Sequence, residues 1–458
     1  MKLYKIILVG VFGLLSIVAL GQSKTSCMHC GMTISNQKFS VTAMDGNDKL
    51  LNFDAIECLI NYQKKSNKIH SQKVTDYNTL KRIDATTAFY VKSKDRPSPM
   101  GAFLSAYASK DEALQVPSGS VMNWEALKAK FKTSGYGEVE HSHHNHHRSD
   151  AHGPIGIMGD HLHPKGGFMV SLRAMHMIMD GNRKGSDKIR NQEIFEDYMV
   201  APQNMTMQMY MLGVMFAPSD KVTLMVMQNF VSNQMDLTSQ MMMPNGMLMQ
   251  RDFETKSSGF GDLKFGALYN IWSTLRTSAH LNGNINIPVG TIDNRDDTPM
   301  TINAKLPYAM QLGSGTFDLT LGATIKGNND RLSWGIQQLN TIRTGRNSED
   351  YRLGNLYEIN LWGAYSFVPQ FSTSVRIQGT SQGKLKGSDS ELNPMMVTTA
   401  DTDNYGGEIL RSFLGFNGLI SNKLSLGLEI GLPIYQNYNG IFMNETLSIN
   451  GGLRYNIL

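Results

Sequence analysis

Long runs in which apolar and polar residues alternate dominate the chain after Gly153, and this pattern limits the fold more than any other feature. In "KLSLGLEIGLPIY" every second residue from Leu424 to Leu432 is apolar, and the residues between them are small, polar or charged. Side chains of a strand point alternately to opposite faces, so each run predicts a β-strand with one apolar face. Strands of a soluble sandwich average about 5 to 6 residues. These longer runs fit a transmembrane barrel, whose apolar face meets lipid.

About twelve such runs follow one another, which predicts an all-β outer-membrane barrel of about 12 antiparallel strands over residues 154–458. Short joins such as "APSD" and "VPQ" alternate without a break with long segments, among them 180–203, 237–255, 291–311 and 386–404. Bacterial barrels have short periplasmic turns and longer external loops in this alternation. An even strand number puts both barrel ends in the periplasm. We expect a Gram-negative outer membrane location, with lipid around the barrel and an N-terminal domain in the periplasm.

Residues 1–21 have the pattern of a secretory signal peptide. Lys2 and Lys5 precede an apolar run, and Ala19 and Gly21 supply the small residues expected before cleavage at Gln22. The net charge of +4 and the charged fraction of 18% give no indication of nucleic-acid binding.

Residues 22–135 predict a small α+β domain. The stretches "KFSVTAM" and "TAFYVKS" are typical of strands, whereas "FDAIECLINYQKK" and "NWEALKAKFK" have helical spacing. All three cysteines lie in this region, at Cys27, Cys30 and Cys58.

The stretch "CMHCGM" places Cys27, Cys30 and Met32 close together, with His29 between the cysteines. Thiolate and thioether are soft ligands that select Cu(I), and four thiolate or imidazole ligands would instead suit zinc. A C-x-x-C pair is also the redox motif of thioredoxin-like proteins, and in an oxidising compartment it forms structural disulfides. From the residues alone these three interpretations stay open.

Further elements follow in order: Asp45-Gly46, Phe53-Asp54 with Cys58, Ala88 with Tyr90-Val91, and Pro99-Met100-Gly101. With "CMHCGM" they resemble the NosL family of periplasmic copper-binding accessory proteins over about residues 24–131. The resemblance implies a small α+β fold and Cu(I) handling, as in copper delivery to nitrous oxide reductase. It makes Cys27, Cys30, Met32 and Met100 the ligand candidates, with His29 and Cys58 next. Core packing is the alternative role for Met100 and Cys58.

Residues 136–153 form a polar connector that is rich in histidine: His141, His143, His144, His146, His147 and His152. Neutral imidazoles bind Cu(II), Zn or Ni, so the connector is a candidate low-specificity metal buffer. The alternative is a solvated spacer.

The barrel entrance reads "HGPIGIMGDHLHPKGGF" and adds Met158, Asp160, His161 and His163, the two histidines being further candidate ligands. Together with "MDGNR", "DDTPM" and "MQLGSGT", this stretch resembles outer-membrane barrels grouped with phenol-degradation pathway channels. The resemblance spans about residues 150–458 and implies the barrel fold, with no defined substrate.

Methionine is concentrated in the first strands of the barrel: of 30 methionines, 19 lie between Met158 and Met249. In "MTMQMYMLGVM", residues 205–215, it occupies every second position as far as Met211. The methionine faces of the neighbouring strands also carry Arg173 and Asn229, and a charge facing lipid costs up to about 2–4 kcal/mol. These faces should therefore point into the lumen. The candidate lumenal ligands are Met175, Met177, Met179, Met205, Met207, Met209, Met211, Met225 and Met227.

Two roles for this wall remain open: a low-affinity path for a soft metal, or flexible side chains that fill a narrow interior. For the whole chain we predict copper transport or homeostasis without catalysis, with copper passed along or tethered at the barrel. The partners would be the copper ion and a periplasmic copper client or efflux component. The alternatives are a channel for small organic solutes and a barrel that only anchors a copper chaperone.

Overall fold

The computed structural model describes residues 27–29, 34, 36–64, 69–93, 95–96, 98–133 and 148–457, apart from residues 245, 275, 330 and 422. The chain divides into two compact units, with the boundary between residues 144 and 145. The predicted signal peptide and residues 136–147 of the predicted connector lie outside the described residues.

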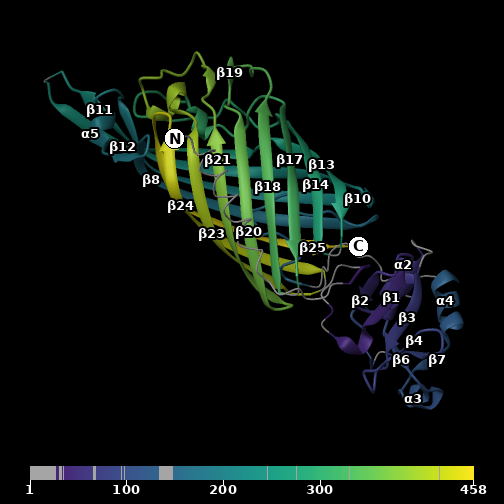
Figure 1. The fold of residues 1–458 in the computed structure, drawn as a ribbon. Coiled ribbons are helices and arrows are strands. Elements are labelled where there is room, and N and C mark those ends of the chain that lie inside the picture. The colour runs from purple at the N-terminus through teal and green to yellow at the C-terminus, as the bar shows by residue number, and fades with distance from the viewer. Residues whose placement is uncertain are drawn as a thin grey trace. The chain divides into compact units, whose positions relative to one another are not determined.

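The N-terminal unit is a small α+β domain, as predicted from its sequence (Figure 1). One sheet has the order β2-β1-β3-β4 and a second has the order β6-β5-β7. The strands are β1 (Val41–Asp45), β2 (Leu50–Phe53), β3 (Ile69–Thr75), β4 (Arg82–Asp84), β5 (Phe89–Lys92), β6 (Leu104–Tyr107) and β7 (Ser120–Met122). The helical segments are η2 (Gln37–Phe39), α2 (Ile56–Gln63), α3 (Lys110–Leu114) and α4 (Trp124–Thr133).

Apolar periodicity explains the core of this domain. Val41 and Ala43 of β1 are buried, and Thr42 between them is half-buried on the other face. Along α4, Trp124, Leu127 and Phe131 are buried, which is the spacing of one helical face. These residues form one hydrophobic cluster with Phe53 of β2 and with the buried face of α2.

The second unit is a closed antiparallel barrel (Figure 1). Within residues 148–457 it has twelve strands, if β12 and β13, which both pair with β11, are counted as one interrupted strand. The ring closes because β8 pairs with both β10 and β25. The strands are β8 (Phe168–Lys184), β10 (Val200–Ser219), β11 (Val222–Met242), β12 (Leu248–Phe260), β13 (Leu263–Ser273), β14 (Thr277–Ile287), β17 (Asp318–Asn328), β18 (Leu332–Arg343), β20 (Leu356–Val368), β21 (Phe371–Gln382), β23 (Gly407–Leu419), β24 (Leu424–Tyr438) and β25 (Ile441–Asn456).

The outer face of the barrel is apolar and exposed. On β10, Tyr210, Leu212 and Phe216 point outward, and on β24 the alternate residues from Leu426 to Ile434 do the same. Aromatic side chains are exposed near the short turns at one rim: Phe216, Tyr269, Trp272, Trp334, Tyr365, Phe367, Phe371 and Tyr455. A closed barrel with an apolar outer band and an aromatic girdle is built to span a lipid bilayer.

The long connections carry short elements of their own: β9 (Asp187–Ile189), α5 (Asn191–Ile194), β15 (Arg295–Asp296), β16 (Ala304–Lys305), η3 (Tyr308–Met310), β19 (Tyr351–Arg352), β22 (Lys386–Gly387), η4 (Thr398–Ala400) and η5 (Thr402–Asn404). Two of these connections fold over the lumen, because Leu306, Met310, Val397 and Ala400 form a buried cluster with side chains from β8, β10, β11 and β25. The barrel mouth on this side is therefore packed.

Two details of the sequence-based prediction are wrong. Most of the segment 237–255 is regular hairpin, because β11 and β12 stay paired as far as Met242 and Leu248 and project beyond the rim (Figure 1). The Met243 N–H donates to the Met247 carbonyl and closes the turn. The alternation of short and long connections also breaks, since residues 439–440 alone join β24 to β25. Neither segment needs an irregular loop, because the strands extend past the predicted ends.

Candidate functional site

Three of the predicted sulfur ligands lie in one buried cluster of the N-terminal domain. Cys27, Cys58 on α2, and Met100 in the turn before β6 all belong to the main hydrophobic core of this domain. The Met28 N–H donates to the Asn52 carbonyl at 2.7 Å, which fastens the Cys27 segment beside β2. His29 is half-buried. Cys30 and Met32 lie outside the described residues. Segments far apart in sequence thus bring soft sulfur atoms into one apolar environment.

Glu57 positions the turn that carries Met100. Its carboxylate Oε1 accepts hydrogen bonds from the Ser98 hydroxyl and from the Ala102 N–H. Burial raises the pKa of Glu57, and the hydrogen bonds from Ser98 and Ala102 oppose that rise. Gly101 between them has φ +75°, a left-handed conformation that glycine adopts without strain. Sequence reasoning missed Glu57, which directly precedes Cys58.

In the barrel unit, residues 148–167 enter the lumen and form a segment that we call the plug. Ile155, Ile157, Asp160 and His161 of the plug are buried among the strands. Its backbone is held by side chains from around the wall: Arg173 on β8, Thr223 on β11, Asn282 on β14, Gln337 on β18, Glu429 on β24 and Arg454 on β25. The plug therefore has a defined conformation inside the barrel.

An inward-facing ion pair fastens the plug at Gly156. Arg376 on β21 and Glu429 on β24 form two parallel hydrogen bonds of 2.9 and 3.0 Å, and the Gly156 N–H donates to the same carboxylate at 2.7 Å. A Cβ at Gly156 would lie 2.4 Å from both charged groups, so the close approach requires glycine. Phe413 stacks on the guanidinium, 3.7 Å from its centre. This arrangement satisfies both buried charges.

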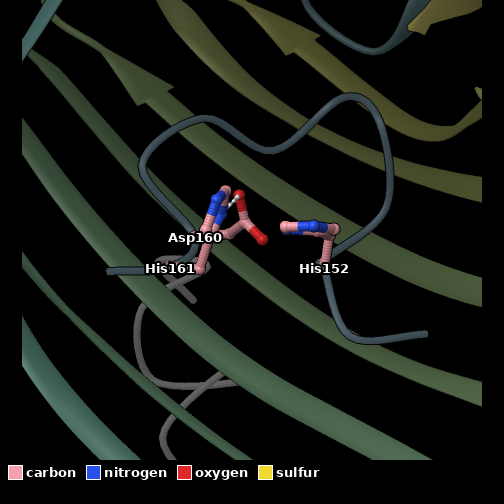
Figure 2. A group of neighbouring side chains, drawn as sticks. All are labelled: His152, Asp160 and His161. Atoms are coloured by element: carbon pink, nitrogen blue, oxygen red, sulfur yellow. Dashed lines mark hydrogen bonds and ion pairs between the residues drawn. The ribbon is translucent and has the colours of Figure 1, made fainter. Parts of the chain in front are cut away.

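The plug gathers histidines around Asp160 (Figure 2). Potential ligand atoms of His152, Asp160 and His161 all lie within 4.8 Å of one another. Asp160 Oδ1 is 2.9 Å from His161 Nδ1, and His161 Nε2 is 3.2 Å from His163 Nε2. The Gly153 N–H donates to the other carboxylate oxygen of Asp160 at 2.6 Å. Three imidazoles and one carboxylate thus converge in a buried place.

Burial keeps the imidazoles of His161 and His163 neutral. It lowers the pKa of His161 to about 3 and that of His163 to about 4, although the Asp160 carboxylate pulls both values upward. Neutral imidazole is the form that binds metal ions. The pair is therefore available as nitrogen ligands at neutral pH.

The methionine faces of β8, β10 and β11 point into the lumen and pair in rows. Opposite Met205 of β10 lie Met179 of β8 and Met235 of β11, and opposite Met215 lie Met169 and Met225. Between these two rows, Met207 pairs with Met177, and Met209 pairs with Met175. The outward residues Tyr210 and Leu212 are about half exposed, at 49% and 52%. The parity argument from the sequence therefore assigned the faces correctly.

The two ends of the methionine wall differ from its middle. Near the plug, Met169, Met215 and Met225 are buried with Leu162 and Leu268. At the other end, Met179, Met205 and Met235 are buried against the folded connections. The middle methionines are half-buried: Met175, Met177, Met207, Met209, Met211 and Met227. Packing accounts for the ends, and Met177, Met207 and Met227 also pack against the end clusters. Met175, Met209 and Met211 are half-buried and belong to neither cluster.

The predicted ligands therefore separate into groups. The structure brings together Cys27, Cys58 and Met100 in one unit, and His152, His161 and His163 in the other. His152, grouped with the connector in the sequence, is buried in the barrel unit. The remaining connector histidines lie outside the described residues: His141, His143, His144, His146 and His147. The sequence pattern places Glu429 on the polar face of its strand but assigns it no role, and sequence reasoning missed Arg376. A charge on the inward face of a strand is the signal that marks both residues.

A cavity of about 300 Å³ opens among the connections at the packed mouth. Its walls are largely apolar, with Met235, Leu237 and Phe253 from the strands, and Arg295 and Lys305 lie at its border. A space of this size could hold a small organic molecule with an apolar body.

No helix among the described residues is long and apolar enough to cross a membrane. The class that the fold defines is a membrane-spanning β-barrel of the outer-membrane type, joined in one chain to a separate small α+β domain.

The two regions of the chain match two different families. Residues 18–130 match the NosL family, and residues 212–402 match the family described as "Putative MetA-pathway of phenol degradation". Both resemblances drawn from the sequence are thereby confirmed. No curated protein matches the chain.

Solved structures similar to this chain are outer-membrane barrels. An outer membrane channel from Pseudomonas putida F1 has a TM-score of 0.46 at 16% identity, covering 66% of this chain and 99% of that one. The NanC porin has a TM-score of 0.33 at 8% identity, covering 62% and 98%. The KdgM porin in complex with disordered oligogalacturonate has a TM-score of 0.30 at 10% identity, covering 63% and 98%. The fold assignment rests on the strand pairing of this chain itself.

Proposed function

We propose that this protein handles copper at the Gram-negative outer membrane. Cu(I) is held by a periplasmic domain through Cys27, Cys30, Met32 and Met100, and the barrel tethers that domain or passes the ion along its lumen. The observation that supports the proposal is that Cys27, Cys58 and Met100 all belong to the buried core of the N-terminal domain. The match of residues 18–130 to the NosL family supports the same chemistry.

Soft ligands in an apolar core favour a monovalent ion. Thiolate and thioether groups select Cu(I), and a hydrocarbon surrounding disfavours the higher charge of a divalent ion. The fixed Met100 turn, held by Glu57, keeps one thioether in place before the ion arrives. Cys58 is fully buried in the same cluster and serves as packing beside the ligands, and His29 is an additional ligand of lower affinity.

The barrel contributes the half-buried methionines of its middle wall. Thioethers bind Cu(I) more weakly than thiolates, so an ion can leave them by ligand exchange. The connector histidines would hold Cu(II), Zn or Ni loosely beside this route. A periplasmic copper client or efflux component would give the ion to the N-terminal domain or take it away.

The test is an anaerobic Cu(I) titration of the full-length protein in detergent micelles, in competition with a coloured Cu(I) chelator. We expect one tight Cu(I) per chain and a loss of affinity of about tenfold or more in Met100→Leu. Met28→Leu is the matched control, because Met28 is a sulfur residue next to Cys27 but is 48% exposed. Equal affinities of the two variants would remove Met100 from the ligand set, and no tight Cu(I) in the unmodified protein would refute the proposal.

The role of the barrel needs a separate measurement. Copper tolerance of cells carrying Met175, Met177, Met207 and Met209 all changed to leucine is compared with that of cells carrying Met242, Met247 and Met249 changed to leucine. The second set lies on the exposed hairpin and serves as the control for lost sulfur. Lower tolerance for the lumenal set alone supports passage of copper, whereas unchanged tolerance favours a barrel that only anchors the domain.

The cavity at the mouth favours a second candidate, a channel for small organic solutes. Its wall is largely apolar and suits a small molecule with an apolar body, while the lining cations Arg295 and Lys305 are already paired with the carboxylates of Glu391 and Asp389. Uptake of benzoate into proteoliposomes, with Leu237→Asp as the blocked variant, tests this function. If Leu237→Asp abolishes benzoate uptake, and the unmodified protein binds no Cu(I) tightly, the solute-channel function would replace the copper proposal.

A further inference from the structure

We propose that the plug carries a second metal site, for a divalent transition-metal ion such as Cu²⁺ or Zn²⁺, with imidazole ligands from His152, His161 and His163. Asp160 orients His161 and contributes a negative charge beside the ion. This site is separate from the sulfur cluster of the N-terminal domain. It would stand even if that domain bound no copper.

The spacing of two nitrogen atoms is the first support. His161 Nε2 and His163 Nε2 are 3.2 Å apart. Two nitrogen ligands about 2.05 Å from one ion, at an angle of about 100°, lie roughly 3.1 Å from each other. The pair thus already has the separation of two neighbouring ligands on one metal ion.

Asp160 supplies the outer support that metal-binding histidines use. Its Oδ1 is 2.9 Å from His161 Nδ1, so it accepts a hydrogen bond there when that nitrogen carries the proton. This contact fixes the ring and leaves Nε2 for the ion. The Gly153 N–H holds the second carboxylate oxygen at 2.6 Å, so the orienting group is itself fixed.

His152 brings the third imidazole from the other end of the plug. Its ring centre is 4.2 Å from that of His161, and one of its ring nitrogens lies within 4.8 Å of potential ligand atoms of Asp160 and His161. The chain reverses between these residues at Gly159, which has φ +63°. Asn282 and Gln337 of the wall donate to backbone carbonyls at this reversal. The strands thus hold the plug in the folded-back form that the site requires.

The chemistry of the donors decides which ions fit. Imidazole nitrogen and carboxylate oxygen suit borderline divalent ions, and the highest affinity within this group is expected for Cu²⁺. The four residues offer no thiolate to select Cu(I). Binding would join residue 152 to residue 163 through the ion and so stabilise the plug inside the lumen.

The test uses the full-length chain in detergent micelles after removal of the competing sites. Cys27, Cys30 and the five connector histidines His141, His143, His144, His146 and His147 are all changed to serine. This background protein is titrated with Cu²⁺, and the bound ion is followed by electron paramagnetic resonance. We expect one tight Cu²⁺ per chain, with coupling to more than one imidazole nitrogen. Because the background lacks Cys27 and Cys30, failure of the Cu(I) proposal leaves this result unchanged.

Three variants and a control locate the site. His161→Gln and His163→Gln should each weaken Cu²⁺ binding by about 100-fold, and Asp160→Asn should weaken it by about 10-fold to 100-fold. His176→Gln is the control, because it removes a histidine of β8 that lies outside the cluster. Heat-modifiable electrophoretic mobility reports whether each barrel is folded. Absence of tight Cu²⁺ in the folded background protein would overturn the proposal, as would equal affinity of His163→Gln and His176→Gln.

Discussion

The N-terminal domain and the barrel plug each gather potential metal ligands, but they surround them in opposite ways. In the domain, Cys27, Cys58 and Met100 lie among aliphatic and aromatic side chains. In the plug, His161 contacts Asp160 and His163, and the charge of Lys326 on β17 acts on both imidazoles. Sulfur ligands need no polar surroundings, whereas imidazoles and carboxylates need hydrogen bonds when they are buried.

The two regions also differ in how their ligands are brought together. Residues 152–163 form one short stretch of the plug, and the wall of the barrel fixes its fold. The sulfur atoms of the domain come from residues as far apart as Cys27 and Met100, so a complete domain fold is needed to unite them. We expect the two sites to fail independently.

The largest expected effect is on the sulfur site. Changing Cys27 and Cys30 to serine should lower Cu(I) affinity by roughly 1,000-fold, because hydroxyl oxygen is a poor ligand for this soft ion. Cu²⁺ binding in the plug should stay within about twofold of the unmodified protein. Parallel Cu(I) and Cu²⁺ titrations of the same preparation measure both. An equal loss of Cu(I) affinity in the domain and of Cu²⁺ affinity in the plug would show that the two sites are coupled, which contradicts their independence.

The next effect is on the polar wall around the plug. Glu429→Ala should destabilise the barrel by about 3–5 kcal/mol, because it leaves the Arg376 guanidinium buried without its carboxylate. It also removes the acceptor of the Gly156 N–H, so the plug should become accessible to proteases. Urea unfolding in micelles and limited proteolysis measure the two effects. Glu408→Ala on the neighbouring strand β23 is a charge-matched control, since Glu408 is only half-buried.

Much of the barrel could be predicted from the sequence because lipid imposes one rule on every strand: alternate side chains must be apolar where they face the membrane. The period of two assigned the methionine faces, as the burial of Met205 and the exposure of Tyr210 and Leu212 confirm. The rule ends at the membrane surface, which explains why the extension of β11 to Met242 was missed. Beyond that surface, the alternation of apolar and polar residues is no longer required.

The site could be predicted only in part, for a different reason. The histidines of the plug attract notice because they are close in sequence, but the backbone of the plug is held by side chains such as Glu429 and Arg454, which come from distant strands. No local pattern in residues 148–167 shows that this segment lies inside the barrel. In the N-terminal domain, the role of Glu57 likewise depends on a contact with Ser98, 41 positions away.

A third effect separates the ends of the methionine wall from its middle. Met235→Ala should destabilise the barrel by about 2–4 kcal/mol, because its side chain is buried against Leu306 and Val397. Met211→Ala should cost less than about 1 kcal/mol, since this side chain is half-buried and belongs to neither buried cluster of the wall. Urea unfolding of the two variants gives the difference. Similar losses would mean that the middle methionines are packing residues too, and the copper path would lose its structural basis.

The smallest effect concerns Cys58. Its substitution tests whether a cysteine that is buried in the same core as Cys27 and Met100 also binds Cu(I). Cys58 is fully buried on α2, and we expect Cys58→Ala to destabilise the domain by about 1 kcal/mol through lost packing. Cu(I) affinity should change by less than about threefold, because the thiolates of Cys27 and Cys30 dominate binding. The same chelator competition measures affinity, and urea unfolding measures stability. A loss of Cu(I) affinity of tenfold or more would make Cys58 a ligand, and the core of this domain would then be part of the metal site.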